Sequence, residues 1–216
     1  MATWGNLSQR PSGLGFMLSF AYKRFDGVVP EPGELDAEDR ALLAQVEAGF
    51  ETVGDLYNAC KFRATPSALL RAGLGEALSL ARDANGYTFA TLSAGLDRKA
   101  PWFQIKEDRQ AAATSMYVIL RVVDNLKMIL APILPHTAQQ LHEYLGYDGR
   151  LFGTQQMVAY HEETRSHQAL TYDHSGAMGT WTKSQLPPGQ PLRQPAPLFR
   201  KLDEGVIQEE YARLEA

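Results

Sequence analysis

The sequence has 216 residues, of which 44% are hydrophobic and 21% are charged, a balance typical of a folded globular domain. Its single cysteine, Cys60, excludes an internal disulfide and any zinc or redox motif that needs paired cysteines. The formal net charge of −4 excludes a general attraction to nucleic acid, so RNA binding would need a local basic patch together with base contacts.

No apolar run approaches the length of a bilayer span, and the N-terminus lacks the basic and apolar pattern of a signal peptide. We therefore expect a cytoplasmic location and no membrane partner.

The first helical pattern along the chain covers residues 36–62, where apolar side chains recur at intervals of three and four residues. Asp36 is placed to cap its N-terminus, and Asp39 occupies the capping-box position three residues on. A stretch rich in Leu and Ala at 69–87 predicts another helix.

The next helical pattern runs over residues 108–131. Pro132 and Pro135 interrupt it, because proline removes a backbone donor and clashes with the preceding turn. A short amphipathic helix follows through residues 138–145. Short connections between these helices predict an antiparallel helix bundle, so the expected fold class is all-α.

The character of the chain changes after residue 146. Residues 147–199 are rich in Gly, Pro, Gln and Thr, and they show neither helical nor strand periodicity. The stretches 186–191 and 194–197 resemble polyproline, yet interspersed apolar side chains predict that the segment packs against a surface. A short acidic helix is expected at 203–214. We therefore divide the chain into a helical domain, residues 1–146, and an irregular extension shaped to pack on another domain, residues 147–216.

Trp102 is a candidate platform for stacking an unpaired nucleotide base. Asn6 and Arg10 are four residues apart, so a helix would place their amide and guanidinium on one face, where they could read base edges. The plainer interpretation places Trp102 in the core and the other two on a solvated helix face. These residues alone leave both interpretations open.

Short runs along nearly the whole chain carry a family resemblance. They are Trp4-Gly5-Asn6-Leu7, Phe20-Ala21-Tyr22-Lys23-Arg24-Phe25, Cys60-Lys61-Phe62-Arg63, Ala100-Pro101-Trp102, Leu130-Ala131-Pro132-Ile133-Leu134-Pro135-His136 and Pro195-Ala196-Pro197-Leu198-Phe199. In this order they resemble the anticodon-binding domain of methionyl-tRNA synthetases. The resemblance implies a helix bundle that recognises the CAU anticodon of methionine tRNA, in support of methionine attachment during translation.

The resemblance also implies roles for individual residues. Asn6 and Arg10 match the readers of anticodon bases, Trp102 matches the stacking aromatic, and Pro101 shapes the loop that carries it. The candidate phosphate contacts are Lys23, Arg63 and Lys106.

Extra segments relative to the family pattern occur at residues 11–16, 65–73 and 88–99. Proline and glycine in the first are expected to break the helix just past Arg10. The third is expected to displace the loop carrying Trp102 from its supporting helix.

The ATP-dependent ligation of the family belongs to a catalytic domain that nothing in this sequence resembles, and there is no Gly-rich phosphate loop. We therefore expect no cofactor here, because ATP and methionine would bind that domain, the partner of this chain in the full enzyme. Five irregularly spaced histidines predict no metal site. The alternatives are a helical docking or scaffold module without RNA affinity, and one half of a split enzyme with a separate catalytic chain.

Overall fold

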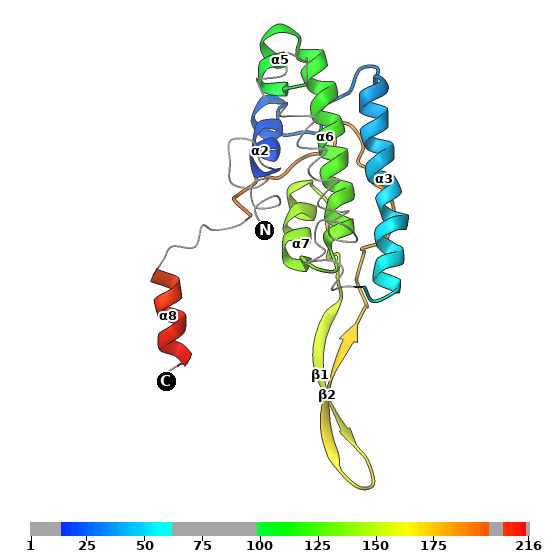
Figure 1. Ribbon diagram of the computed structural model, residues 1–216, viewed down its shortest axis with the longest axis vertical. Helices are drawn as coiled ribbons and strands as arrows, with labels where there is room; N and C mark the ends of the chain where they lie inside the picture. Colours follow the sequence, from blue (N-terminus) through cyan, green and yellow to red (C-terminus); the bar gives the residue numbers. More distant parts are fainter. Residues whose placement is uncertain (1–13, 62–98, 199–204, 215–216) are drawn as a thin grey trace.

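The fold is a bundle of helices around one central helix, with a two-stranded hairpin extending from one end (Figure 1). The computed structural model describes residues 14–61, 99–198 and 205–214. Its elements, in chain order, are α2 (Leu14–Arg24), α3 (Ala37–Asn58), α5 (Pro101–Glu107), α6 (Arg109–Leu130), α7 (Pro135–Tyr144), β1 (Thr154–His161), β2 (Ser166–Asp173) and α8 (Gly205–Leu214).

Helix α6 is the centre of the bundle, and α2, α3, α5 and α7 all contact it (Figure 1). Of its 22 residues 17 are buried, which is typical of a helix surrounded on most sides. Its start is fixed by the Asp108 carboxylate, which accepts hydrogen bonds from the amides of Gln110 and Ala111 at 2.9 and 3.0 Å. The helix ends at Leu130, two residues before Pro132, as predicted.

Helix α3 begins with the capping box that the sequence predicts. The amide of Asp39 donates to Asp36 Oδ1 at 2.9 Å, and the amide of Asp36 donates to Asp39 Oδ2 at 3.0 Å. The apolar face of α3 buries Leu42, Leu43, Val46, Phe50 and Val53 in the core.

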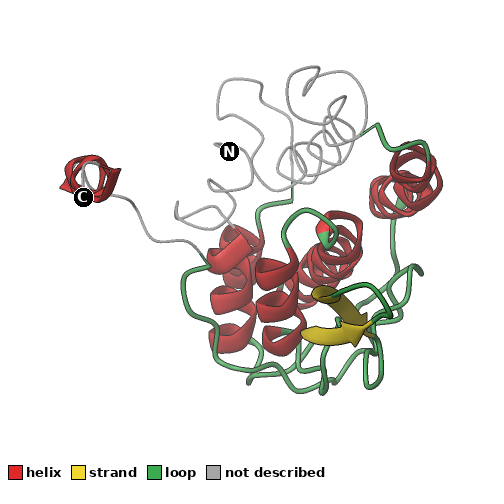
Figure 2. Cartoon of the chain, turned by 90° about the horizontal axis from the view of Figure 1, so that it is seen from below, coloured by secondary structure: helices red, strands yellow, loops and turns green. Residues whose placement is uncertain are grey.

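Helix α7 begins at Pro135, and Pro132 lies in the turn that separates it from α6, so the predicted break is confirmed. Leu141 and Leu145 are fully buried. The acidic helix predicted near the end is present as α8, which lies apart from the bundle (Figure 2). The helix predicted at 69–87 lies outside the described residues. Among the helices that the structure describes, none is long and apolar enough to cross a bilayer.

The helix bundle is confirmed, but the all-α class is wrong for residues 154–173. There β1 and β2 pair antiparallel, with Met157 opposite Leu170 and Tyr160 opposite His167. The hairpin buries no continuous apolar face, since Met157 is 60% exposed and Leu170 is 61% exposed. Its half-buried face instead carries small and polar residues such as Ala169 and Thr171, so hydrophobic alternation could not reveal it.

The segment after the hairpin returns along the bundle and completes its core. Leu186, Leu192 and Leu198 are buried in the same cluster as the helices. Backbone hydrogen bonds of 2.9 Å from the amide of Val29 to the carbonyl of Gln190, and of 2.7 Å from the amide of Leu192 to the carbonyl of Gly27, join it to the α2–α3 connection. The Pro-rich residues therefore pack on this chain itself, while the division at residue 146 stays a prediction.

Candidate nucleic-acid interface

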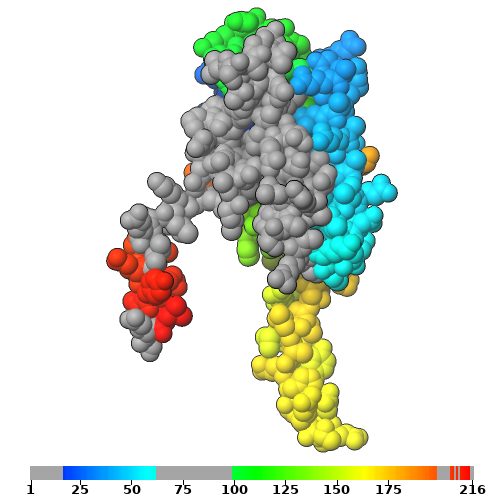
Figure 3. All heavy atoms as spheres, in the orientation of Figure 1, coloured from blue at the N-terminus to red at the C-terminus, as the bar shows by residue number. Residues whose placement is uncertain are grey.

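Helix α5 lies at the end of the bundle opposite the hairpin (Figure 3) and carries three of the candidate RNA-binding residues, Pro101, Trp102 and Lys106. A fourth candidate, Lys23, lies in the last turn of α2. Pro101 and Trp102 are the first two residues of α5, so the expectation that a loop carries Trp102 is wrong. Ala100 is extended and Pro101 occupies the first helical position, where its fixed φ favours helix initiation. Asn6, Arg10 and Arg63 lie outside the described residues.

Trp102 is half-buried and packs against the main core, so the core interpretation is confirmed in part, while stacking on a base stays a prediction. Ile105, one turn along α5, packs against the same core. These contacts hold the indole in place and leave part of it accessible. An aromatic ring fixed in this way loses little side-chain entropy when a base stacks on it.

Phe103, which is not among the predicted site residues, is 63% exposed beside Trp102. The two ring centroids are 6.3 Å apart, and their planes are tilted by 57°. The Lys106 ammonium lies 6.0 Å from the centroid of the Phe103 ring. Helix α5 therefore presents an exposed aromatic ring and a cation on its outer side. An aromatic residue directly after the predicted stacking tryptophan is the signal that could have indicated it.

Exposed cations also end helix α2, which lies close to the start of α6. Lys23 and Arg24 form its last turn and are exposed. Arg109 joins the two helices, because its Nη2 lies 3.1 Å from the carbonyl of Arg24 and 3.5 Å from Asp26 Oδ2. Within the described part of the chain, Lys23, Arg24 and Lys106 form no ion pair. Their charge is available to a phosphate backbone.

Lys99 positions the start of α5 instead of facing solvent. Its ammonium lies 2.5 Å from Asp36 Oδ2 and 2.5 Å from Asp39 Oδ1, at the start of α3. Burial acts to lower the pKa of Lys99, but hydrogen bonds to the two carboxylates outweigh it, so the pKa is raised and the ammonium stays charged. The pKa of Asp36 is lowered, chiefly by its hydrogen bond to Lys99. This ion pair fixes the segment that leads into Trp102.

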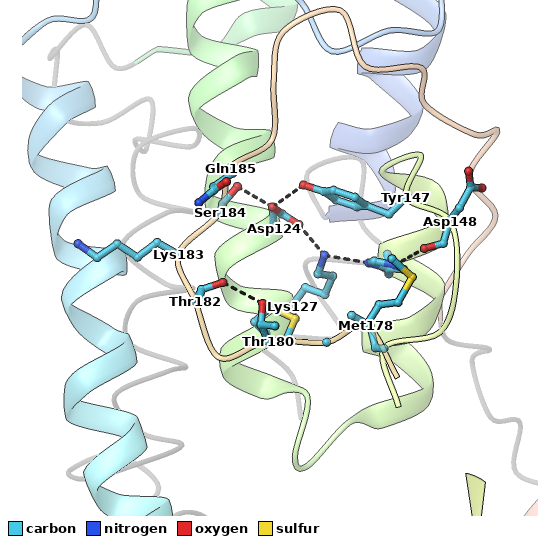
Figure 4. Close-up of a pocket in the computed structure, with 14 residues that line it drawn as sticks. Asp124, Lys127, Tyr147, Asp148, Met178, Thr180, Thr182, Lys183, Ser184 and Gln185 are labelled. Atoms are coloured by element: carbon cyan, nitrogen blue, oxygen red, sulfur yellow. Dashed lines mark hydrogen bonds and ion pairs between the residues drawn. The ribbon is translucent and has the colours of Figure 1, made fainter. Parts of the chain in front are cut away.

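A second cluster of polar residues lines a cavity of about 560 Å³ between α6, α7 and residues 178–185 (Figure 4). Asp124 is its centre. The carboxylate accepts hydrogen bonds from Lys127 Nζ at 2.6 Å, from the Tyr147 hydroxyl at 2.9 Å and from Ser184 Oγ at 2.5 Å. These groups come from three different segments of the chain, and each finds its hydrogen-bond partner within the cluster. The cluster therefore acts as a polar cross-link of the fold.

His142 extends this network to the loop after α7. Its Nε2 lies 3.2 Å from the carbonyl of Asp148 and donates to it, so Nδ1 is the acceptor that faces Lys127 Nζ at 3.4 Å. The imidazole stacks on the Tyr147 ring with centroids 4.9 Å apart. Burial and the Lys127 charge lower the pKa of His142, and burial lowers the pKa of Lys127. Across the described ranges, no three His, Cys, Asp or Glu side chains come together as metal ligands would.

Comparisons with known proteins relate this chain to one family. Residues 89–174 match the family model of the anticodon binding domain of methionyl tRNA ligase, a range that includes α5, α6, α7 and the hairpin. The chain is 47% identical over 216 residues to a methionine–tRNA ligase of Thermomicrobium roseum, covering 99% of this chain and 33% of that protein. It is 46% identical over 220 residues to the methionine–tRNA ligase of Chloroflexus aggregans, covering 100% of this chain and 32% of that protein.

Solved structures show the same fold. The apo form of Mycobacterium tuberculosis methionyl-tRNA synthetase matches with a TM-score of 0.63 and 24% identity, over 94% of this chain and 32% of that one. The same enzyme bound by methionyl-adenylate matches with a TM-score of 0.59 and 25% identity, over 92% of this chain and 31% of that one. The chain spans about a third of the length of the curated relatives it matches. It belongs to the family of methionyl-tRNA synthetase anticodon-binding domains.

Proposed function

We propose that this chain binds the anticodon loop of methionine tRNA and recognises the bases of its CAU anticodon at the α5 end of the bundle. The observation that carries the proposal is the placement of Trp102, which the core holds half-exposed at the start of α5. Splayed bases of a single-stranded loop are bound by stacking on such rings. The family to which residues 89–174 belong supports this interpretation.

Recognition divides between stacking, base-edge contacts and phosphate contacts. Trp102 stacks on one anticodon base, and Pro101 fixes the start of the helix beneath it. Asn6 and Arg10 remain the predicted readers of base edges, because an amide both donates and accepts while a guanidinium donates in a fixed fork. The cations proposed to contact phosphates are Lys23, Lys106 and, from the sequence, Arg63.

This recognition would serve a larger enzyme. The relatives are methionine–tRNA ligases about three times as long as the matched region. We infer that ATP and methionine bind the remaining part of such an enzyme, and that this chain contributes the selection of the correct tRNA.

The test is a titration of the chain with a labelled stem-loop that carries CAU, beside an identical stem-loop with those three bases changed. Both are measured by fluorescence anisotropy at low and at moderate salt. The proposal predicts tighter binding of the CAU loop, and this preference should survive added salt because base contacts release no counterions. Equal or absent binding of both loops would contradict the proposal and favour the docking or scaffold alternative.

A further inference from the structure

Among the described residues, Phe103 has no packing role that explains an aromatic residue at its position. Helix α5 buries one side against the core through Trp102 and Ile105. Phe103 lies outside that described core and is 63% exposed. A ring in this position gains little from burial, although a fully buried phenylalanine would contribute about 1.5–3 kcal/mol. The exposed ring is therefore a binding feature more than a stabilising one.

The surroundings of Phe103 indicate what kind of group would cover it. Lys106 places its ammonium 6.0 Å from the ring centroid, and Lys23 and Arg24 are exposed at the end of α2. A hydrophobic protein surface would have to desolvate these charges. A nucleotide offers a flat base to the ring and a phosphate to the cation, so it satisfies both.

The geometry of the two rings decides how many bases they bind. A base held between two parallel rings needs about 7–8 Å between them, because each face contact is about 3.5–4 Å. The centroids of Trp102 and Phe103 are only 6.3 Å apart, and their planes are tilted by 57°. One base therefore cannot stack on both rings at once, and two different bases would be needed to cover both rings.

We propose that Phe103 stacks on a second base of the same RNA loop, distinct from the base on Trp102, and that Lys106 contacts a phosphate next to this second base. This inference rests on the proposed function and deepens it, since it adds a stacking residue that the family resemblance does not supply. It makes the α5 surface a two-base platform.

A double-mutant cycle between protein and RNA tests the proposal. The protein variants are Phe103→Ala, Phe103→Leu and Phe103→Trp, and the RNA variants are CAU stem-loops with one abasic nucleotide at each loop position in turn. Phe103→Ala should weaken binding of the intact loop roughly 5- to 150-fold, the range for loss of one base–aromatic stack. Phe103→Leu should lose most of the same affinity, because it keeps apolar bulk but has no π-face. Phe103→Trp should bind within about threefold of wild type.

The cycle should locate the second base. The effect of Phe103→Ala should disappear with one abasic loop, and that position should differ from the position coupled in the same way to Trp102→Ala. Wild-type affinity in Phe103→Ala or Phe103→Leu, or coupling of both aromatic residues to one position, would overturn the inference while CAU selectivity stands. If the wild-type chain does not distinguish the CAU loop from the base-changed loop, the proposed function itself is overturned.

Discussion

The ammonium of Lys99 lies 2.5 Å from the carboxylate of Asp39, a residue that is only 1% exposed. Lys99 lies two residues before the start of α5, and Asp39 lies in the first turn of α3. One ion pair therefore ties the segment carrying Trp102 to a capping box at the start of another helix. The position of the stacking ring depends on a contact 60 residues away in the sequence.

Removing this tether should reduce both stability and RNA affinity. Lys99→Met leaves the buried Asp39 carboxylate without its cation, so we expect the free energy of unfolding to fall by about 2 kcal/mol. The affinity for the CAU stem-loop should fall as well, because α5 loses its anchor. Urea unfolding and anisotropy measure the two effects. The matched control is Lys183→Met, which removes a surface ion pair with Glu47 and should cost less than about 1 kcal/mol. Equal losses in the two variants would contradict the tether.

The carboxylate of Asp124 should be essential to the polar cross-link in the cavity. Asp124→Ala leaves the Lys127 ammonium buried without a carboxylate, so we expect a loss of about 3–5 kcal/mol in urea unfolding. Adding Lys127→Met to this variant removes the unpaired charge and should recover part of the loss. A double variant that is less stable than Asp124→Ala would show that the two side chains do not act as a pair.

Stability should also depend on pH through His142. Because its pKa is lowered in the folded state, the unfolded chain binds this proton more readily. The free energy of unfolding should therefore decrease as pH falls from about 6.5 towards the lowered pKa. Urea unfolding at several pH values checks this, and His142→Gln should show a shallower slope. His136→Gln, at an exposed position of the same helix, is the matched control. An unchanged slope in His142→Gln would contradict the assignment.

The extension should be part of the folding unit. Leu186 is 1% exposed within the core that the helices share, so Leu186→Ala should cost about 2–5 kcal/mol. Leu170→Ala removes the same atoms from the exposed face of the hairpin and should stay within about 0.5 kcal/mol of wild type. Thermal unfolding in one cooperative transition is expected for both variants. A small effect of Leu186→Ala would mean that the extension folds separately from the bundle.

Local signals in the sequence predicted much of the bundle. Asp36 and Asp39 indicated the start of α3 because a capping box involves only neighbouring residues, and Pro132 marked the end of α6 for the same reason. The family resemblance drew attention to Trp102 and Pro101, but it placed them in a loop. The structure shows them in a helix that begins at proline.

What the sequence did not predict depends on contacts between distant segments. The hairpin exposes Met157 and Leu170, so its strands lack the apolar alternation that marks a strand with one buried face. The two carboxylate partners of Lys99 lie about 60 residues away at the start of α3, so no local pattern around Lys99 indicates them. The exposure of Phe103 was equally hidden, since helical spacing alone does not show which side of a short helix packs on the core.

The most direct test of the account compares three proteins with the CAU stem-loop and its base-changed counterpart: the wild-type chain, Trp102→Ala and Tyr211→Ala. Tyr211 is an exposed aromatic residue on α8, away from the bundle. We predict that Trp102→Ala loses roughly 1–3 kcal/mol of binding to the CAU loop. Tyr211→Ala should bind like the wild type, with selectivity intact. Trp102→Phe, which keeps a stacking face, should retain more affinity than Trp102→Ala, and circular dichroism should show unchanged helicity in every variant. Wild-type affinity and selectivity in a folded Trp102→Ala protein would contradict the assignment of this surface to the anticodon.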